Sequence, residues 1–206
     1  KAPWGGHNLC LLRRGLAGRR VVARVARARP PPAVHRSAHG AEVVHRLHQQ
    51  PEVGIGFFPD VGSCYFLSRC PDEMGTYLAL TGASIGPEDM CTAGLATHYV
   101  PAEKQAALIA ALKNVAGEGE DKLAAMLDEY HEGSTAVSSL NLNKEVIEEC
   151  FSADDVSQIM ARLQQKAGSF KNINDIREIL ESRSPISLKV TLSHLRQAKQ
   201  MEFDDV

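Results

Sequence analysis

The sequence is poor in the features that hold together secreted, metal-binding and membrane-spanning proteins. Its five cysteines are odd in number and form no Cys-x-x-Cys pair, which argues against a disulfide framework or a zinc site and favours a reducing compartment. No apolar run approaches the roughly 20 residues that a helix needs to cross a bilayer. Aromatic residues make up 5% of the chain. With 206 residues, of which 44% are hydrophobic and 23% charged, the chain is large enough for one globular domain with its own core.

Acidic residues are almost missing from the first 50 positions. That segment carries Lys1 and nine arginines against Glu42 alone, a net charge of +9, whereas the rest of the chain carries 13 basic and 24 acidic side chains, a net charge of −11. Trp4 is the one aromatic residue of the segment, so no interleaved stacking pattern for nucleic acid is present. We expect the chain to divide into a basic, poorly ordered segment, 1–49, and a globular domain, 50–206.

The most specific motif begins where the composition changes. Residues 51–62 read PEVGIGFFPDVG, in which Glu52 and Asp60 flank a stretch rich in glycine and phenylalanine. Glycine and proline disfavour a regular helix, so we expect a folded-back loop that brings Glu52, from a strand end, towards Asp60. Asp60 precedes an apolar run and is predicted to cap a helix there. Two acids beside the apolar wall of Phe57 and Phe58 can have their pKa values pushed apart, as acid/base chemistry requires.

By pattern alone, such an Asp is most often a structural cap and such a Glu is usually solvated. The whole segment, followed by YFL at 65–67, resembles the signature of the 3-hydroxyisobutyryl-CoA hydrolase family in the enoyl-CoA hydratase/isomerase (crotonase) superfamily. The resemblance continues, in the family's order, through LALTG at 78–82, AGLATHYV at 93–100, CFSA at 150–153 and SPISLKVTL at 184–192. It therefore covers residues 51 to about 195.

The resemblance implies an α/β fold: a partial crotonase-like fold with a remnant of the ββα spiral and a mostly helical C-terminal part. It also implies a short acyl-CoA thioester as substrate, with 3-hydroxyisobutyryl-CoA of valine breakdown as the leading candidate, and a mitochondrial location. Glu52 would attack the thioester carbonyl or activate water, Asp60 would handle the substrate hydroxyl or a proton, and Phe57 and Phe58 would contact the substrate. No metal or nucleotide motif is recognisable, so coenzyme A is expected only as part of the substrate. Homo-oligomer formation is left open.

Two alternatives stay open beside the hydrolase. Enoyl-CoA hydratases and isomerases share the fold, but they usually carry a glycine-rich stretch where this chain has FFPD at 57–60, which favours the hydrolase. A non-catalytic relative associated with the mitochondrial ribosome, which some fungal members resemble, would suit the basic first segment through RNA binding.

The first 49 residues do not fit the family. The family places a Met-Gly-Gly-Gly-type turn ahead of the Pro-Glu motif, where its backbone N–H groups hold the thioester oxygen, and the interval here contains no such turn. Out-of-frame translation would give this composition, including the three prolines at 30–32. A mitochondrial targeting peptide and a nucleic-acid-binding arm are the alternatives. Little packed structure is expected before residue 42. Without the oxyanion turn, and with a C-terminus that also looks truncated, we expect an incomplete and inactive member of the family.

Beyond residue 70 the pattern is mostly helical. Helices are expected over 72–80, ending at Gly82, and over about 87–94, with a strand at 95–100 and a loop at 131–143. Ser152, Ser169 and Pro185 are predicted to begin three further helices. Cys64 is expected to be a buried small residue and not an activated thiol. The apolar stripes at helical spacing comprise Leu108, Ile109, Leu112 and Val115; Leu123, Met126, Leu127 and Tyr130; Val156, Ile159, Met160 and Leu163; Phe170, Ile173, Ile176 and Leu180; and Leu188, Leu192 and Leu195.

Overall fold

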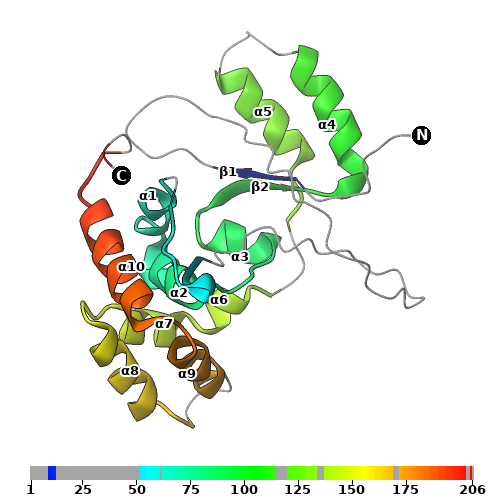
Figure 1. Ribbon diagram of the computed structural model, residues 1–206. Coiled ribbons are helices and arrows are strands. Elements are labelled where there is room, and N and C mark those ends of the chain that lie inside the picture. Colours follow the sequence, from blue (N-terminus) through cyan, green and yellow to red (C-terminus); the bar gives the residue numbers. More distant parts are fainter. Residues whose placement is uncertain are drawn as a thin grey trace.

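The computed structural model describes residues 9–12, 52–60, 62–114, 120–133, 137–168, 172–202 and 205 (Figure 1). Most of the described chain is helical, and no helix within it is long and apolar enough to cross a membrane. The elements in chain order are β1 (Leu9–Leu12), η1 (Glu52–Ile55), α1 (Ser63–Leu67), η2 (Pro71–Glu73), α2 (Met74–Thr81), α3 (Pro87–Thr92), β2 (Ala96–Val100), α4 (Ala102–Asn114), α5 (Glu120–Tyr130), α6 (Ser139–Leu142), α7 (Lys144–Phe151), α8 (Val156–Gln165), α9 (Ile173–Glu181) and α10 (Pro185–Ala198), where η marks a 3₁₀ turn.

β1 and β2 pair as an antiparallel two-stranded sheet. Leu9 lies opposite Val100 and Leu11 opposite His98, and the register is irregular between Leu11 and Leu12. The strand expected at 95–100 is confirmed as β2. β1 lies within the basic first segment, where little packed structure is expected before residue 42, so residues 9–12 form a short strand in that segment. The remainder of 1–49 lies outside the described residues.

The main core surrounds α2, which is buried along almost its whole length. Gly75 lets α1 approach closely, because a Cβ at this position would stand 1.8 Å from the carbonyl oxygen of Leu67. Gly82 follows α2 in the left-handed conformation, with φ of 69°, which glycine adopts without steric cost. The helix expected over 72–80 is confirmed with a later start, since the two residues before Met74 have positive φ.

Helices α7 to α10 complete this core, and two side-chain caps fix where helices begin. The carboxylate of Asp155 accepts a hydrogen bond from the N–H of Ser157 and caps α8. The hydroxyl of Ser184 accepts from the N–H of Ser187 and caps α10, which begins at Pro185 as expected. The stripes of the last three helices are confirmed by their buried members, which are Ile159, Leu163, Ile173, Ile176, Leu180, Leu188, Leu192 and Leu195.

Three details of this helical region differ from the expectation. Ser152 follows the end of α7 and does not cap α8. The loop expected at 131–143 contains the short helix α6, and no stripe or cap predicted α7. Ser169 and Phe170 lie outside the described residues, and α9 begins at Ile173. The cause in the first case is spacing, since Asp155 stands directly before α8 whereas Ser152 stands three residues earlier.

A second, smaller cluster holds α4 and α5 against β2. Figure 1 shows these two helices as a pair on the opposite side of the sheet from α7, α8 and α9. The stripe of α5 is confirmed, but Ile109 of α4 is 48% exposed and so is not part of the predicted buried face. Val115 lies outside the described residues. The buried members of the cluster are Val100, Leu108, Met126 and Leu127.

Candidate active site

The Pro-Glu motif continues into the 3₁₀ turn η1. Val53 anchors the turn in the interior at 1% exposure, and the N–H of Phe57 donates to the carbonyl oxygen of Glu52 at 2.8 Å. Gly56 has φ of 79°, a conformation that a helix does not allow. The folded-back loop is therefore confirmed, although Glu52 begins a 3₁₀ turn and does not end a strand. Pro51 lies outside the described residues.

The carboxylate of Glu52 keeps one acceptor oxygen without a partner. Its Oε2 is buried and receives no hydrogen bond from the described part of the chain. Leaving a buried acceptor unsatisfied costs about 1–3 kcal/mol, so such groups call for an explanation. The negative charge of Glu52 also affects the nearby Cys64 thiol. Burial, followed by this charge, raises the pKa of Cys64 to about 11. Cys64 is thus a buried, protonated thiol as expected, and Glu52 presents an acceptor that a bound water or substrate can use.

Asp60 is exposed and contributes to α1 through its backbone. Its carbonyl oxygen accepts from the N–H of Ser63 at 2.9 Å and from the hydroxyl of Ser63 at 2.7 Å. The residue at the N-cap position is Gly62, with φ of 76°, and no side chain caps α1. The prediction that the Asp60 side chain caps this helix is therefore wrong, because the left-handed Gly62 turns the chain so that a backbone carbonyl takes that place. The Asp60 carboxylate is left on the surface.

Cys64 connects the two ends of the motif. Its thiol donates to the carbonyl oxygen of Pro59 at 3.6 Å, next to Asp60, while its pKa responds to Glu52. The structure therefore brings the Glu52 side chain and the Pro59-Asp60 backbone to the same buried thiol. It does not join the two carboxylates by a hydrogen bond within the described residues.

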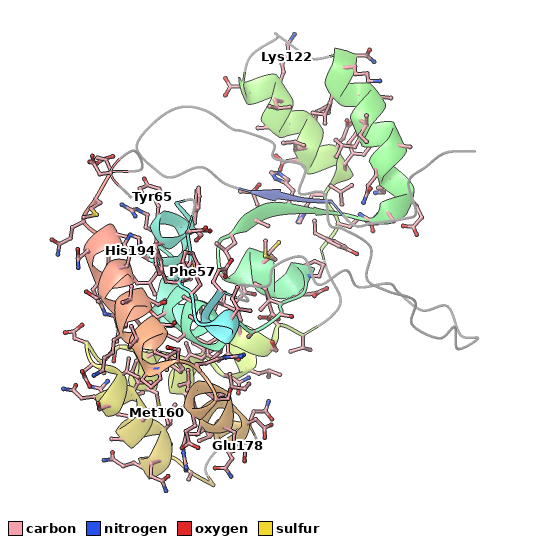
Figure 2. The ribbon with its side chains drawn as sticks, in the orientation of Figure 1. Phe57, Tyr65, Lys122, Met160, Glu178 and His194 are labelled. Carbon is pink, nitrogen blue, oxygen red and sulfur yellow. The ribbon has the colours of Figure 1, made fainter. Side chains whose placement is uncertain are left out.

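Phe57 and Phe58, which are expected to form an apolar wall, stack on each other. Their rings stack with centroids 4.5 Å apart, and Phe58 meets the ring of His194 edge-on at 6.5 Å. Figure 2 shows Phe57, Tyr65 and His194 in the same region of the molecule, where the motif and α1 meet α10. Phe57 is 45% exposed. Large exposed apolar side chains also occur on both elements of this contact, at Ile55, Ile186 and Val190.

A cavity of about 210 Å³ opens elsewhere, bordered by α1, η2 and α7, and neither candidate carboxylate lines it. Two of its acidic side chains already have partners, since Glu73 pairs with Arg196 at 2.8 Å and Asp72 with Lys144 at 3.0 Å. Across the described ranges, no cluster of three or more His, Cys, Asp and Glu side chains could hold a metal ion. The cavity therefore adds nothing to the chemistry of the motif.

Sequence reasoning did not find His194 or Arg183, whose guanidinium packs against η1. His194 follows Ile186 and Val190 at intervals of four residues along α10, and it is the member of this series whose ring meets Phe58. No spacing in the sequence relates Arg183 to position 54, since only the tertiary fold brings them together.

Residues 45–206 match the model of the enoyl-CoA hydratase/isomerase family, so the chain belongs to this family, as the motif predicted. Within it, the chain is similar to human mitochondrial 3-hydroxyisobutyryl-CoA hydrolase, with 36% identity over 164 residues, which are 78% of this chain and 42% of the human protein. The probable 3-hydroxyisobutyryl-CoA hydrolase 2 of Arabidopsis thaliana is 36% identical over 152 residues, covering 72% of this chain and 40% of that protein. The chain thus spans about two fifths of the length of these relatives.

Solved structures show the same fold. A carnitinyl-CoA dehydratase from Mycobacterium thermoresistibile is similar with a TM-score of 0.65 and 36% identity, over 75% of this chain and 43% of that one. An enoyl-CoA hydratase from Rhodobacter sphaeroides 2.4.1 is similar with a TM-score of 0.62 and 29% identity, over 75% and 42% of the two chains. The predicted fold class, a partial crotonase-like α/β fold with a mostly helical C-terminal part, is confirmed.

Proposed function

We propose that this chain carries the catalytic motif of an acyl-CoA thioester hydrolase whose substrate is 3-hydroxyisobutyryl-CoA. The observation that carries the proposal is the buried Oε2 of Glu52, an acceptor with no donor in the described part of the chain, in a motif that also carries the exposed Phe57. The hydrolase names of relatives that are 36% identical support the reaction and the acyl group.

In the proposed reaction, Glu52 accepts a proton from a water molecule as the water oxygen attacks the thioester carbonyl. The tetrahedral intermediate then collapses, the C–S bond breaks, and the coenzyme A sulfur leaves with the electron pair and takes up a proton. Direct attack by the Glu52 carboxylate would instead give a mixed anhydride that water hydrolyses afterwards. If water attacks the Glu52 carbonyl of this anhydride, one water oxygen stays in the Glu52 carboxylate, so label in Glu52 after a single turnover in heavy-oxygen water identifies the anhydride route.

The other motif residues receive supporting roles. The exposed carboxylate of Asp60 does not cap α1, so it can handle the substrate hydroxyl or a proton. The stacked rings of Phe57 and Phe58 give the acyl chain an apolar surface. Coenzyme A enters as part of the substrate, and no other cofactor is proposed.

The rate of the proposed reaction also depends on N–H donors to the oxyanion of the tetrahedral intermediate. Losing one oxyanion donor typically lowers the rate by about 10²–10³. Because the sequence carries no Met-Gly-Gly-Gly-type turn, we expect the purified 206-residue chain to lack measurable thioesterase activity. Turnover at a rate typical of enzymes would contradict this expectation.

The setting proposed for this activity is the breakdown of valine in the mitochondrion. It rests on the word mitochondrial in the names of vertebrate relatives. The division into a basic segment, 1–49, and a hydrolase domain, 50–206, stays a prediction, and the family match begins a few residues before this boundary.

The experiment places residues of this chain within a relative of greater length. Residues 52–202 of this chain replace the aligned residues of the human hydrolase, and release of coenzyme A from 3-hydroxyisobutyryl-CoA is measured with a thiol reagent. We expect the chimaera to hydrolyse the substrate and Glu52→Gln to lower kcat about 10²–10⁴-fold while substrate binding persists. Glu129→Gln, at an exposed position of α5, is the matched control and should leave kcat unchanged. Near-normal turnover by Glu52→Gln would exclude the catalytic role.

Asp60 is tested in the same chimaera. Asp60→Asn should lower turnover and leave the melting temperature unchanged, because the side chain contributes no capping bond to α1. If Asp60→Asn lowers the melting temperature and leaves turnover per folded molecule unchanged, Asp60 has a structural role only.

A second candidate function has its own support, since the two solved structures described above are named as a dehydratase and a hydratase. An enoyl-CoA hydratase would add water to crotonyl-CoA without releasing coenzyme A. The loss of enoyl absorbance with no free thiol would therefore favour the hydratase, and thiol release from 3-hydroxyisobutyryl-CoA the hydrolase.

A further inference from the structure

We propose that Arg183 is the residue that positions the η1 turn, and through it the carboxylate of Glu52. The inference rests on the proposed function for its catalytic meaning, but its structural content can be measured independently. Arg183 comes from the short connection between α9 and α10, about 130 positions away from the turn in sequence.

The backbone of Arg183 is fixed on both sides by helix ends. Its N–H donates to the carbonyl oxygen of Leu180 at 3.1 Å, which closes the end of α9. The next residue, Ser184, caps α10 with its hydroxyl. Because the backbone is held at both helix ends, the Arg183 side chain extends from a fixed position, as a positioning residue requires.

The guanidinium links η1 to the end of α2. Nη2 donates to the carbonyl oxygen of Thr81 at 2.9 Å, at the C-terminal end of α2, where a helix leaves carbonyls unpaired and favours a cation. Nη1 lies against Gly54, so close that a Cβ at that position would stand 2.9 Å away. Thr81 is 1% exposed and belongs to a core helix, so the hydrogen bond to its carbonyl oxygen attaches the guanidinium, and the η1 turn beside it, to the core.

Two complementary groups beside η1 stay unpaired. Glu52 Oε2 is a buried acceptor and Arg183 Nε a buried donor, and neither has a partner within the described part of the chain. The absence of a bond between them has a chemical consequence. A guanidinium bonded to Glu52 would occupy the oxygen that must accept a proton, whereas one that packs against Gly54 fixes the turn and leaves the lone pairs of Oε2 unused by the described part of the chain.

The closing bond of η1 gives a direct measurement. The amide hydrogen of Phe57 donates to the Glu52 carbonyl oxygen, so its exchange with solvent in the 206-residue chain reports whether the turn is held. We expect Arg183→Met to speed exchange of this amide at least tenfold, with the amides of α10 unchanged. Arg183→Lys should restore part of the protection, because lysine keeps the charge near Thr81 but lacks the flat guanidinium.

Two comparisons separate this effect from general destabilisation. Gly54→Ala should speed exchange of the Phe57 amide alone, since its Cβ displaces the guanidinium, and should add nothing in the Arg183→Met background. Arg162→Met is the matched control, because its guanidinium also bonds a helix carbonyl, that of Glu149, without contacting η1. Unchanged exchange in Arg183→Met, strictly additive effects, or an unprotected Phe57 amide in the wild type would each overturn the proposal.

The catalytic consequence is measured separately in the chimaera. There, Arg183→Met should lower kcat about tenfold or more with KM unchanged, and Arg183→Lys should recover part of it. If the wild-type chimaera does not hydrolyse the thioester, the proposed function fails while the exchange measurement still decides the positioning role. If hydrolysis is intact and kcat does not respond to Arg183→Met, the catalytic part of this inference is wrong.

Discussion

Replacing Arg196 with leucine should destabilise the protein far more than the same change at Arg177. Arg196 lies on α10, and its Nη2 donates to the carbonyl oxygens of Phe151 at 2.7 Å and Ala153 at 3.0 Å, at the end of α7. Its Nη1 contacts Glu73 Oε2 at 2.8 Å, and the two side chains are only 24% and 20% exposed. One guanidinium thus holds α10, the end of α7 and η2 together.

The magnitude follows from what leucine leaves behind. Leucine keeps part of the apolar stem but leaves two carbonyls and the Glu73 carboxylate without this donor. Hydrogen bonds to charged groups contribute about 1.5–3 kcal/mol each, and breaking a buried ion pair costs about 3–5 kcal/mol. Because the side chains of Arg196 and Glu73 are partly exposed to water, we expect the lower end of the range for a buried pair, a loss of about 3 kcal/mol in the free energy of unfolding. The additional pair with Asp154 contributes little, since Asp154 is 88% exposed.

Urea unfolding and thermal melting measure the effect. For a chain of this size, about 3 kcal/mol corresponds to a fall of about 6–12 °C in Tm. Arg177→Leu is the control, because among the described residues the polar bonds of Arg177 go to the side chains of Gln164 and Glu181, and it should change stability by no more than about 0.5 kcal/mol. Equal losses in the two variants, or a loss below about 1 kcal/mol for Arg196→Leu, would refute the reasoning.

Gly75→Ala should prevent folding or cost at least about 3 kcal/mol, because the Cβ would overlap backbone that cannot move aside; Gly133→Ala, in open space, should be neutral by melting. Because the pKa of Cys64 is raised from 9.0 to about 11 in the folded protein, its contribution to the free energy of unfolding is fully present below pH 9 and is lost as the pH rises towards 11; Cys64→Ala should flatten that decline. Glu52→Gln should lower the pKa of Cys64, seen as faster alkylation of that thiol at fixed pH. Hydrogen bonding to Ser157 lowers the pKa of Asp155, so its contribution is present above pH 3.8 and lost in more acidic solution, and Asp155→Asn should remove this acid dependence of melting.

The helices that the sequence predicted are those whose signals are local. In α10, a capping serine, a proline at the first position and a leucine stripe all point to the same boundaries. In α6 the local signal is a single cap, since the Ser138 hydroxyl accepts from the N–H of Asn141 at 3.1 Å, and further support comes from a distant residue. Asp89 of α3 accepts from the hydroxyl of Ser138 at 2.7 Å and from the N–H of Leu140 at 2.9 Å, so a carboxylate about 50 residues away satisfies the start of that helix. Residues 131–143 therefore predicted a loop where tertiary contacts support a turn of helix.

The candidate site divides in the same way. The glycines and the proline around Glu52 and Asp60 predicted the folded-back loop, because they act on the backbone close to their own positions. The enzyme family came from the resemblance of the whole segment and of the motifs that follow it. The cap was predicted at the wrong atom, since the positive φ of Gly62 turns a backbone carbonyl, and not the Asp60 carboxylate, towards Ser63. Backbone conformation at one glycine thus decided which group of Asp60 is used.

The sequence by itself determined the family, through the resemblance carried by the motif at 51–62 and by the segments that follow it. It also determined the strand at 95–100 and the buried stripes of the later helices, because side-chain periodicity acts over a few residues. Only the tertiary structure decided which groups of the site are satisfied. It placed Arg183 against Gly54, His194 beside Phe58, and the Glu52 carboxylate near a buried thiol with one oxygen unpaired. These contacts join residues more than a hundred positions apart or depend on burial, and both are properties of how the helices pack.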